Sequence, residues 1–379
     1  MPLVDDGQLR RAVAGDGVAE SLVALMGLGP ARDDEFRITS WHHDDATGER
    51  EIAVDQTNES VVVGERAVVK WAVRLPDEAE GVSQPAAARI TALAESAFTG
   101  MPRPWGLLHW DDGGLDLMLA SVVSLLPDAR DGWEWAVQDV SDAALGRTSI
   151  DAALISPRRL GALVADMHTS LVRTTWGTDA GTVRSWEARA IHELHEALSL
   201  VDGAEGDRLR LRAPRIEGVY SAFRTCVGTP RIEVHGDLHV GQVLRYGSPP
   251  DYAVTDFDGN PVLSASDRVN PQPAALDVAG MLASLDHVGR VVIRRTEGAD
   301  IDVVRRWIDA SQTVFLEAYR EKLAIAGRTD LLDERLLRPL RVQQEVREFL
   351  YAVRHLPHWR YVPDAALGDL FADRPTTDP

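Results

Sequence analysis

Cysteine and lysine are both scarce in this chain of 379 residues. Cys226 is the single cysteine, so neither an internal disulfide nor a cysteine-based zinc site can form within the chain. Only Lys70 and Lys322 are lysines, and arginine supplies the other basic side chains. Because lysine is so rare here, we expect Lys70, which follows a valine-rich segment, to have a specific role.

Positive charge is also in deficit as a whole. The 40 Lys and Arg residues stand against 59 Asp and Glu residues, which gives a formal net charge of −19. Nucleic acid or an anionic membrane surface would repel such a chain, so we expect neither as the main partner. The hydrophobic fraction of 45% and the charged fraction of 26% are typical of a globular protein and argue against a disordered chain.

Long hydrophobic runs are missing as well. No stretch approaches the roughly 18 uninterrupted apolar residues of a membrane span. Residues 1–6 lack the basic and apolar regions of a signal peptide. We therefore expect a cytoplasmic protein, and we take a monomer as the expected assembly.

The predicted elements change from strands to helices along the chain. Hairpins are predicted over 60–75, with a turn at Gly64-Glu65, and over 105–123, with a turn at 111–114. Apolar residues at helical spacing predict helices over 85–97, 133–145, 157–171, 186–200, 215–223, 274–292, 301–326 and 332–354. We therefore predict an α+β fold with a ligand cleft between two lobes: a β-rich lobe at 1–120 with a cap segment at 1–60, a connector at 121–132 and a helical lobe at 133–379.

Two polar clusters lie in a strand-and-loop block that interrupts the helices. Residues 234–244 read V-H-G-D-L-H-V-G-Q-V-L, and residues 254–261 read V-T-D-F-D-G-N-P. Phosphoryl transfer from a nucleotide needs a carboxylate that deprotonates the acceptor hydroxyl, oxygen ligands for Mg²⁺ and a cation for the phosphates. The residues available for these roles are Asp237 as the base, Gln242, Asp256 and Asp258 as metal ligands, and Lys70 as the cation.

Plainer interpretations exist for these residues. Lys70 could be an exposed strand lysine, and His-Gly-Asp occurs in ordinary turns. His235 and His239 could bind zinc, but no third ligand follows at a familiar spacing. We expect His235 to hold its loop by hydrogen bonding.

The motif H-G-D-L-H-V-G-Q-V-L followed by D-F-D-G resembles the catalytic and metal loops of aminoglycoside phosphotransferase-like kinases. The similarity is closest to the maltokinase-like branch, which includes bacterial glucosamine kinases, and it extends through residues 160–171, 277–282 and 351–359. The resemblance implies a bilobal protein-kinase-like fold that uses ATP and Mg²⁺.

The same resemblance implies roles for individual residues. Asp237 becomes the base, and Gln242 and Asp256 become metal ligands, although the superfamily usually has Asn in place of Gln242. Lys70 and His239 are assigned to the nucleotide, residues 119–126 to the adenine hinge, and Glu95 is the helix carboxylate available to pair with Lys70.

The acceptor site is expected on the helix around residues 342–354. Helical spacing places Glu345, Glu348 and Tyr351 on one face, and Trp359 follows shortly after. Carboxylates and aromatic rings are the groups that bind sugars, whereas the plainer alternative is a solvated helix face with a capping Trp. Maltokinases are similar to this chain in the corresponding region, but they have a second glutamate at the position of Ala352.

We therefore predict an ATP-dependent sugar kinase with an amino sugar as acceptor, because two neighbouring carboxylates can bind an ammonium group. Glucosamine is the best candidate, with phosphate transferred to its C6 hydroxyl. The predicted sugar-binding residues are Asp237, Glu345, Glu348, Tyr351 and Trp359. A maltokinase, an aminoglycoside antibiotic phosphotransferase and a non-catalytic nucleotide or sugar sensor remain as alternatives, and the complete set of catalytic residues argues against the sensor.

Overall fold

The computed structural model describes residues 3–5, 9–33, 35–52, 59–72, 84–111, 116–260, 263 and 265–372. Its contacts divide the chain into two compact units. The first contains residues 1–130 and 244–270, and the second contains residues 131–243 and 271–379. The predicted domain boundaries placed residues 244–270 in the helical lobe. In the structure they group with the first unit, because the amide of Val254 donates to the carbonyl of Gly100 at 2.8 Å and Arg245 pairs with Arg130.

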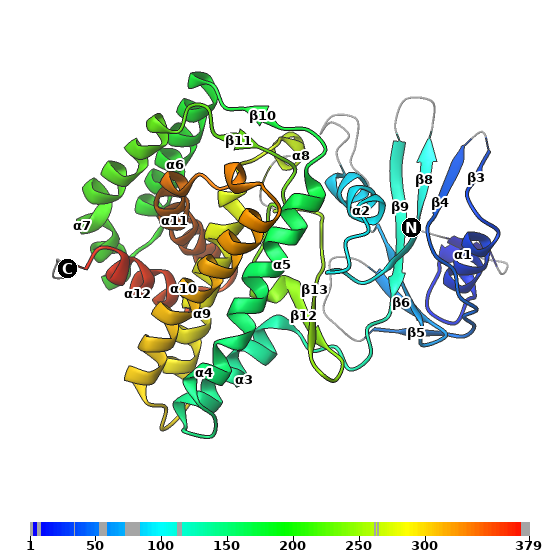
Figure 1. Cartoon of the computed structure of the whole chain (residues 1–379), viewed down its shortest axis with the longest axis horizontal. Helices are drawn as coiled ribbons and strands as arrows, with labels where there is room; N and C mark the ends of the chain where they lie inside the picture. The colour runs from blue at the N-terminus through cyan, green and yellow to red at the C-terminus, as the bar shows by residue number, and fades with distance from the viewer. Residues whose placement is uncertain are drawn as a thin grey trace. The chain divides into compact units, whose positions relative to one another are not determined.

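The first unit is built on a seven-stranded sheet (Figure 1). Its strands run in the order β3-β4-β8-β9-β7-β6-β5, and neighbouring strands are antiparallel. The predicted hairpins are confirmed as β6–β7 and β8–β9, although most of the second predicted turn lies outside the described residues. The strands are β3 (Ala31–Arg32), β4 (Phe36–Ser40), β5 (Glu49–Glu51), β6 (Glu59–Val63), β7 (Ala67–Trp71), β8 (Pro104–Asp111) and β9 (Asp116–Ser124).

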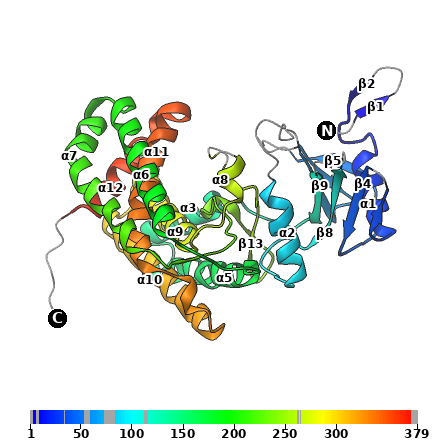
Figure 2. The same cartoon turned by 90° about the horizontal axis from the view of Figure 1, so that it is seen from above.

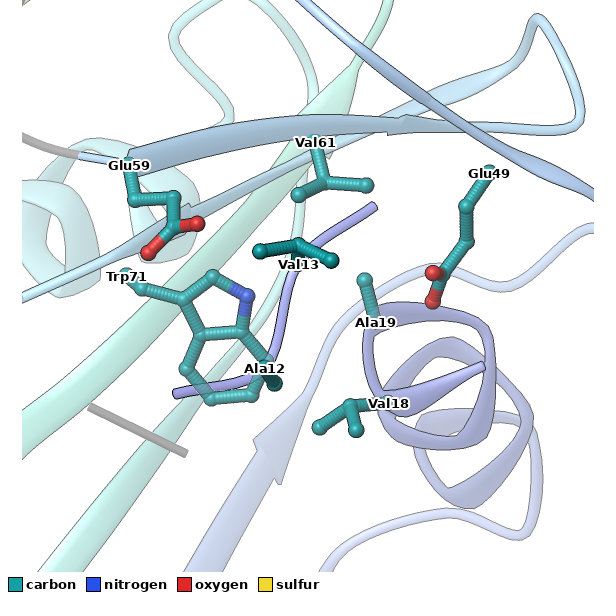
Figure 3. Close-up of a pocket in the computed structure, with 8 residues that line it drawn as sticks. All are labelled: Ala12, Val13, Val18, Ala19, Glu49, Glu59, Val61 and Trp71. Carbon is teal, nitrogen blue, oxygen red and sulfur yellow. The ribbon is translucent and has the colours of Figure 1, made fainter. Parts of the chain in front are cut away.

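Helix α1 (Val18–Gly27) covers part of this sheet and shares its core. Leu22, Val23 and Met26 of the helix pack with strand residues such as Val69 and Trp105. A cavity of about 10 Å³ remains between the helix and the strands (Figure 3). This volume is close to the minimum that one water molecule needs, so the cavity offers no room for a larger ligand.

The first unit also contains two strand pairs and two helices outside the descriptions above. They are the paired strands β1 (Leu3–Asp5) and β2 (Leu9–Arg11), helix α2 (Pro85–Glu95), the paired strands β12 (Val243–Tyr246) and β13 (Asp251–Val254), and helix α8 (Ala265–Val269). Strand β12 begins at the last residue of the second unit and leads the chain into the first.

The second unit consists mainly of helices around the buried helix α9 (Ala275–Arg295). Helix α9 contacts α3, α10, α11 and α12, and α6 and α7 pack against α11 (Figures 1 and 2). The other helices are α3 (Gly132–Ala144), α4 (Ile150–Ala153), α5 (Ile155–Leu171), α6 (Ala180–Leu200), α7 (Gly203–Tyr220), α10 (Ile301–Ile325), α11 (Leu337–His355) and α12 (Tyr361–Leu370), and the paired strands are β10 (Trp176–Gly177) and β11 (Pro230–Arg231).

Each helix predicted for this unit is present, but several bounds differ: α6 begins at Ala180 instead of 186 and α11 at Leu337 instead of 332. Helix α12 was not predicted, and the largest change of length is in α7. Helix α7 begins at Gly203, twelve residues before the predicted start at 215. Its first turns are rich in charged residues and present only a narrow buried stripe that includes Gly206 and Leu209, so apolar spacing marks them weakly. Within the described residues, no helix combines the length and apolar character that crossing a bilayer requires.

Candidate functional site

Lys70 lies in the middle of the sheet of the first unit and points to two carboxylates. Strand β7 places it in register with Ser60 and Ser121 of the flanking strands. Its Nζ lies 2.7 Å from Oδ1 of Asp256 and 3.0 Å from Oδ2 of Asp258. Burial lowers the pKa of the Lys70 ammonium, but the two carboxylates outweigh this effect and raise its pKa. Lys70 is therefore held as a cation.

The loop after β13 folds so that both carboxylates reach the same cation. Asp256 adopts a left-handed backbone conformation with φ of 64°, which few residues other than Gly, Asn and Asp adopt. Gly259 follows with φ of 74°. Two carboxylates that converge on one cation are a donor set that suits Mg²⁺, which prefers hard oxygen ligands. Glu95, the carboxylate expected from a helix, is the exposed last residue of α2.

The loop with Asp237 is held in the second unit by one face of α9. Asp277 accepts from the amides of His235 at 2.7 Å and Gly236 at 2.8 Å, and Ser284 accepts from the amide of Val240 at 3.0 Å. Positions 277, 280 and 284 lie on one helix face. At Gly280, between the two polar residues, an added Cβ would lie 2.5 Å from the carbonyl oxygen of Leu238. The loop therefore lies directly against this face, and Gly280 permits the approach.

Asp277 belongs to a buried chain of polar groups. Nε2 of His168 lies 3.0 Å from Oδ2 of Asp277, and Nδ1 of His168 lies 2.7 Å from the hydroxyl of Tyr319. Burial raises the pKa of the Asp277 carboxyl. The hydrogen bond from His168 and the charges of His168 and His235 lower the pKa by more than burial raises it, so it lies below its usual value. Asp277 thus acts as a buried carboxylate that fixes the backbone immediately before Asp237.

The two histidines beside Asp237 shape the loop itself. Nδ1 of His235 accepts from the amide of Asp237 at 3.3 Å, which is the loop-holding role expected for His235. Nδ1 of His239 accepts from the amide of Gly241 at 3.1 Å and caps the short turn that contains Gln242. Asp237 and Gln242 are both half-buried. Within the described ranges, no three His, Cys, Asp or Glu side chains group as a metal site.

The acidic residues of α11 that were predicted to share one face lie in different surroundings in the structure. Glu345 is fully buried, and its two carboxylate oxygens lie 2.9 and 3.1 Å from Nε2 of His287 on α9. Glu348 is half-buried, whereas Tyr351 is 47% exposed and packs on His355. Three residues turn a helix by about 300°, so Tyr351 lies about 120° around the axis from Glu345. The expectation of one shared face was therefore wrong for this pair, and direct contact of Glu345 with a sugar would require His287 to move.

Glu348 lies next to a group of aromatic rings. Its Oε2 accepts from Nε1 of Trp359 at 2.9 Å, and its Oε1 accepts from Gln344 at 3.1 Å. Trp359 meets Trp133 and His287 edge to face, each with ring centroids 6.0 Å apart. The ring of Trp133 in turn lies 6.4 Å from that of His239. A continuous row of side chains therefore connects Glu348 to the loop of Asp237.

Sequence reasoning missed three residues of this arrangement. Trp133 is the second residue of α3, two positions after the capping residue Asp131, and His287 and Asp277 interrupt the apolar pattern of α9. Polar residues inside an otherwise buried helix are a signal that could have identified the last two, because such groups need partners.

The curated relatives identify the family of this chain. A glucosamine kinase of Streptacidiphilus jiangxiensis is 55% identical over 379 residues, which is 99% of this chain and 86% of that protein. The chain belongs to the glucosamine kinase family. A second member, a glucosamine kinase of Mycolicibacterium smegmatis (strain ATCC 700084 / mc(2)155), is 45% identical over 380 residues, covering 98% of this chain and 92% of that protein. No protein-family model matches the chain.

Solved structures of glucosamine kinases have the same fold. One crystal form superimposes with a TM-score of 0.90 at 54% identity and covers 99% of this chain and 86% of the other. A glucosamine kinase in complex with glucosamine, ADP and inorganic phosphate superimposes with a TM-score of 0.89 at 53% identity, covering 98% and 87%. The resemblance to the glucosamine kinase branch and the predicted α+β kinase-like fold are therefore confirmed.

Proposed function

We propose that this chain transfers the γ-phosphate of ATP to the C6 hydroxyl of glucosamine, with glucosamine 6-phosphate and ADP as products. The observation that carries the proposal is its near full-length similarity, at 53% identity, to the glucosamine kinase whose complex contains glucosamine, ADP and phosphate. The convergence of Lys70, Asp256 and Asp258 supplies the local chemistry that such a reaction needs.

The nucleotide phosphates are assigned to Lys70 and the metal loop. Asp256 and Asp258 already converge on one cation, the ammonium of Lys70, so their oxygens fit a divalent ion. We assign Mg²⁺ to Asp256 and Asp258 of the first unit. The roles of Gln242 as a metal ligand and of His239 in nucleotide binding are assigned from the resemblance of their loop to the kinase family. When bound, Mg²⁺ would neutralise charge on the transferring phosphoryl group. Lys70 is assigned to the phosphate oxygens, where its raised pKa keeps it cationic.

Asp237 is assigned as the base. Its carboxylate accepts the proton of the sugar hydroxyl while the hydroxyl oxygen forms a bond to the γ-phosphorus and the bond to the bridging oxygen of ADP breaks. The buried carboxylate of Asp277 and the hydroxyl of Ser284 hold the backbone on both sides of Asp237, so the base keeps its orientation without rearrangement of the loop.

The sugar is assigned to the row of side chains that leads from Glu348 to His239. The half-buried Trp133 offers aromatic surface to the C–H face of a sugar, and the carboxylate of Glu348 can accept a hydrogen bond from the sugar ammonium group. Trp359 is buried, so we assign it the part of holding the carboxylate of Glu348 through its indole N–H. We assign Glu345 an indirect part through His287 and Tyr351 a place at the rim. We further propose that the enzyme acts as a cytoplasmic monomer.

A substrate panel tests this function. Purified protein is incubated with ATP, Mg²⁺ and glucosamine, glucose, maltose or kanamycin, and ADP release is measured together with phosphorus NMR of the product. We expect turnover of glucosamine and a phosphate on its C6 oxygen. Turnover of maltose alone would contradict the proposal. Binding of ATP or glucosamine without turnover of any of the sugars would indicate a sensor instead of an enzyme.

A further inference from the structure

Arg89 is a buried arginine that connects α2 to the loop with the two carboxylates. Its side chain lies on α2 and the residue is only 5% exposed. Nη1 donates to the carbonyl of Phe257 at 2.8 Å, and Nη2 donates to the carbonyl of Arg268 at 2.8 Å. All three residues belong to the first unit, although 168 and 179 positions separate Arg89 from its acceptors. One guanidinium thus ties together α2, the 256–258 loop and α8.

The position of the acceptor carbonyl gives this contact its significance. Phe257 lies between Asp256 and Asp258, so its carbonyl belongs to the peptide group that joins Phe257 to Asp258. Asp256, the residue before Phe257, has the left-handed backbone conformation, which sets the direction of the chain as it enters this peptide group. A planar guanidinium presents its N–H groups in set directions, and it can therefore hold two carbonyls at a fixed angle, which the single ammonium of lysine does not.

We propose that Arg89 is a positioning residue for phosphoryl transfer, which sets the backbone of the 256–258 loop so that Asp256 and Asp258 converge on a single cation. This inference rests on the proposed function, because it takes these two carboxylates as ligands of the metal that accompanies ATP. Arg89 touches neither the nucleotide nor the sugar in this scheme. Its effect should therefore be seen in metal affinity and leave the affinity for glucosamine nearly unchanged.

The test measures metal binding directly. Mn²⁺ binding in the presence of ADP is followed by electron paramagnetic resonance for the wild type, Arg89→Lys, Arg89→Ala and the control Arg50→Met. Arg50 is an exposed arginine of the same unit, and its partner is Glu65 in the β6–β7 turn. We expect Arg89→Lys to bind Mn²⁺ about tenfold more weakly, as is typical when the groups supporting metal ligands are removed. The KM for glucosamine should stay within about twofold of the wild-type value, and Arg50→Met should match the wild type.

Chemical rescue separates positioning from a general loss of stability. Guanidinium chloride at millimolar, non-denaturing concentrations should restore part of the Mn²⁺ affinity of Arg89→Ala, because the free cation can occupy the vacated site. Should Arg89→Ala not fold, Arg89→Lys keeps the charge and the aliphatic stem and carries the test alone.

Two outcomes would overturn the inference: wild-type Mn²⁺ affinity in a folded Arg89→Lys, even with a lower melting temperature, or an equal loss in Mn²⁺ and glucosamine affinity. Failure of the proposed function is distinguishable from both, because in that case the wild-type enzyme itself does not phosphorylate glucosamine.

Discussion

Nζ of Lys70 lies 2.7 Å from Oδ1 of Asp256, although 186 positions separate the two residues in sequence. The second carboxylate, that of Asp258, lies 3.0 Å from the same nitrogen. The contact places one of only two lysines of the chain at the loop that we assign to the metal.

Replacing Lys70 with Met should lower kcat/KM for ATP by about 100-fold, because the transferring phosphoryl group loses an electrostatic partner. Steady-state kinetics at saturating glucosamine measure this effect. Lys322→Met is a matched control, since Lys322 is the only other lysine and pairs with Asp166 on α5. Equal kinetics for the two variants would remove Lys70 from the nucleotide site.

Replacing Asp237 with Asn should lower kcat by about 10²- to 10⁴-fold, the range expected when a general base is lost. The affinity for ATP, measured by calorimetry, should remain close to that of the wild type, because the base acts on the sugar hydroxyl. Asp302→Asn, at an exposed position in the first turn of α10, serves as the control. Near-normal turnover by Asp237→Asn would refute its assignment as the base.

Replacing Glu348 with Gln should raise the KM for glucosamine about tenfold and leave the KM for glucose within about twofold, because a charge-assisted hydrogen bond to the ammonium group is lost. The amide oxygen of Gln can still accept from the indole of Trp359, so the local packing should persist. Glu334→Gln, at an exposed position where Glu334 pairs with Arg320, is the control. A similar increase for both sugars would place Glu348 away from the amino group.

The buried pair of His287 and Glu345 should make stability depend on pH. Burial lowers the pKa of His287, but the carboxylates of Glu345 and Glu348 outweigh it and raise the pKa from 6.5 to about 9. Burial also raises the pKa of Glu345, so the pair retains its proton to higher pH than either group would in water. Because the folded state binds this proton more tightly than the unfolded state, the stabilisation is complete below pH 6.5 and is lost as pH rises through 9.

Urea unfolding between pH 6 and pH 10 tests this dependence. The free energy of unfolding of the wild type should fall toward that of His287→Gln by at most about 3 kcal/mol as pH rises through this window. Circular dichroism at each pH confirms that both proteins start from the folded state. Parallel pH profiles for the two proteins would show that His287 carries no proton of this kind.

The sequence alone determined much of the local structure. The hairpin around Gly64 and the helices now identified as α3, α5, α9, α10 and α11 could be predicted, because alternation and helical spacing of apolar residues depend only on neighbours along the chain. The block with Asp237, Gln242, Asp256 and Asp258 was found for a similar reason, since polar residues between short apolar strands mark loops. The residue types themselves suggested phosphoryl transfer, and the resemblance to a kinase family then added the fold and the substrate class.

The tertiary structure alone decided how these elements combine. Glu345 and Glu348 looked equivalent by spacing, but α9 covers the side of α11 that bears Glu345 and pairs it with His287, 58 positions away. Asp277, which holds the amides before Asp237, and Arg89, which holds the carbonyl of Phe257, likewise act on residues 41 or more positions distant. Such contacts depend on how helices pack and how a loop closes on them, and no local pattern of residues encodes that geometry.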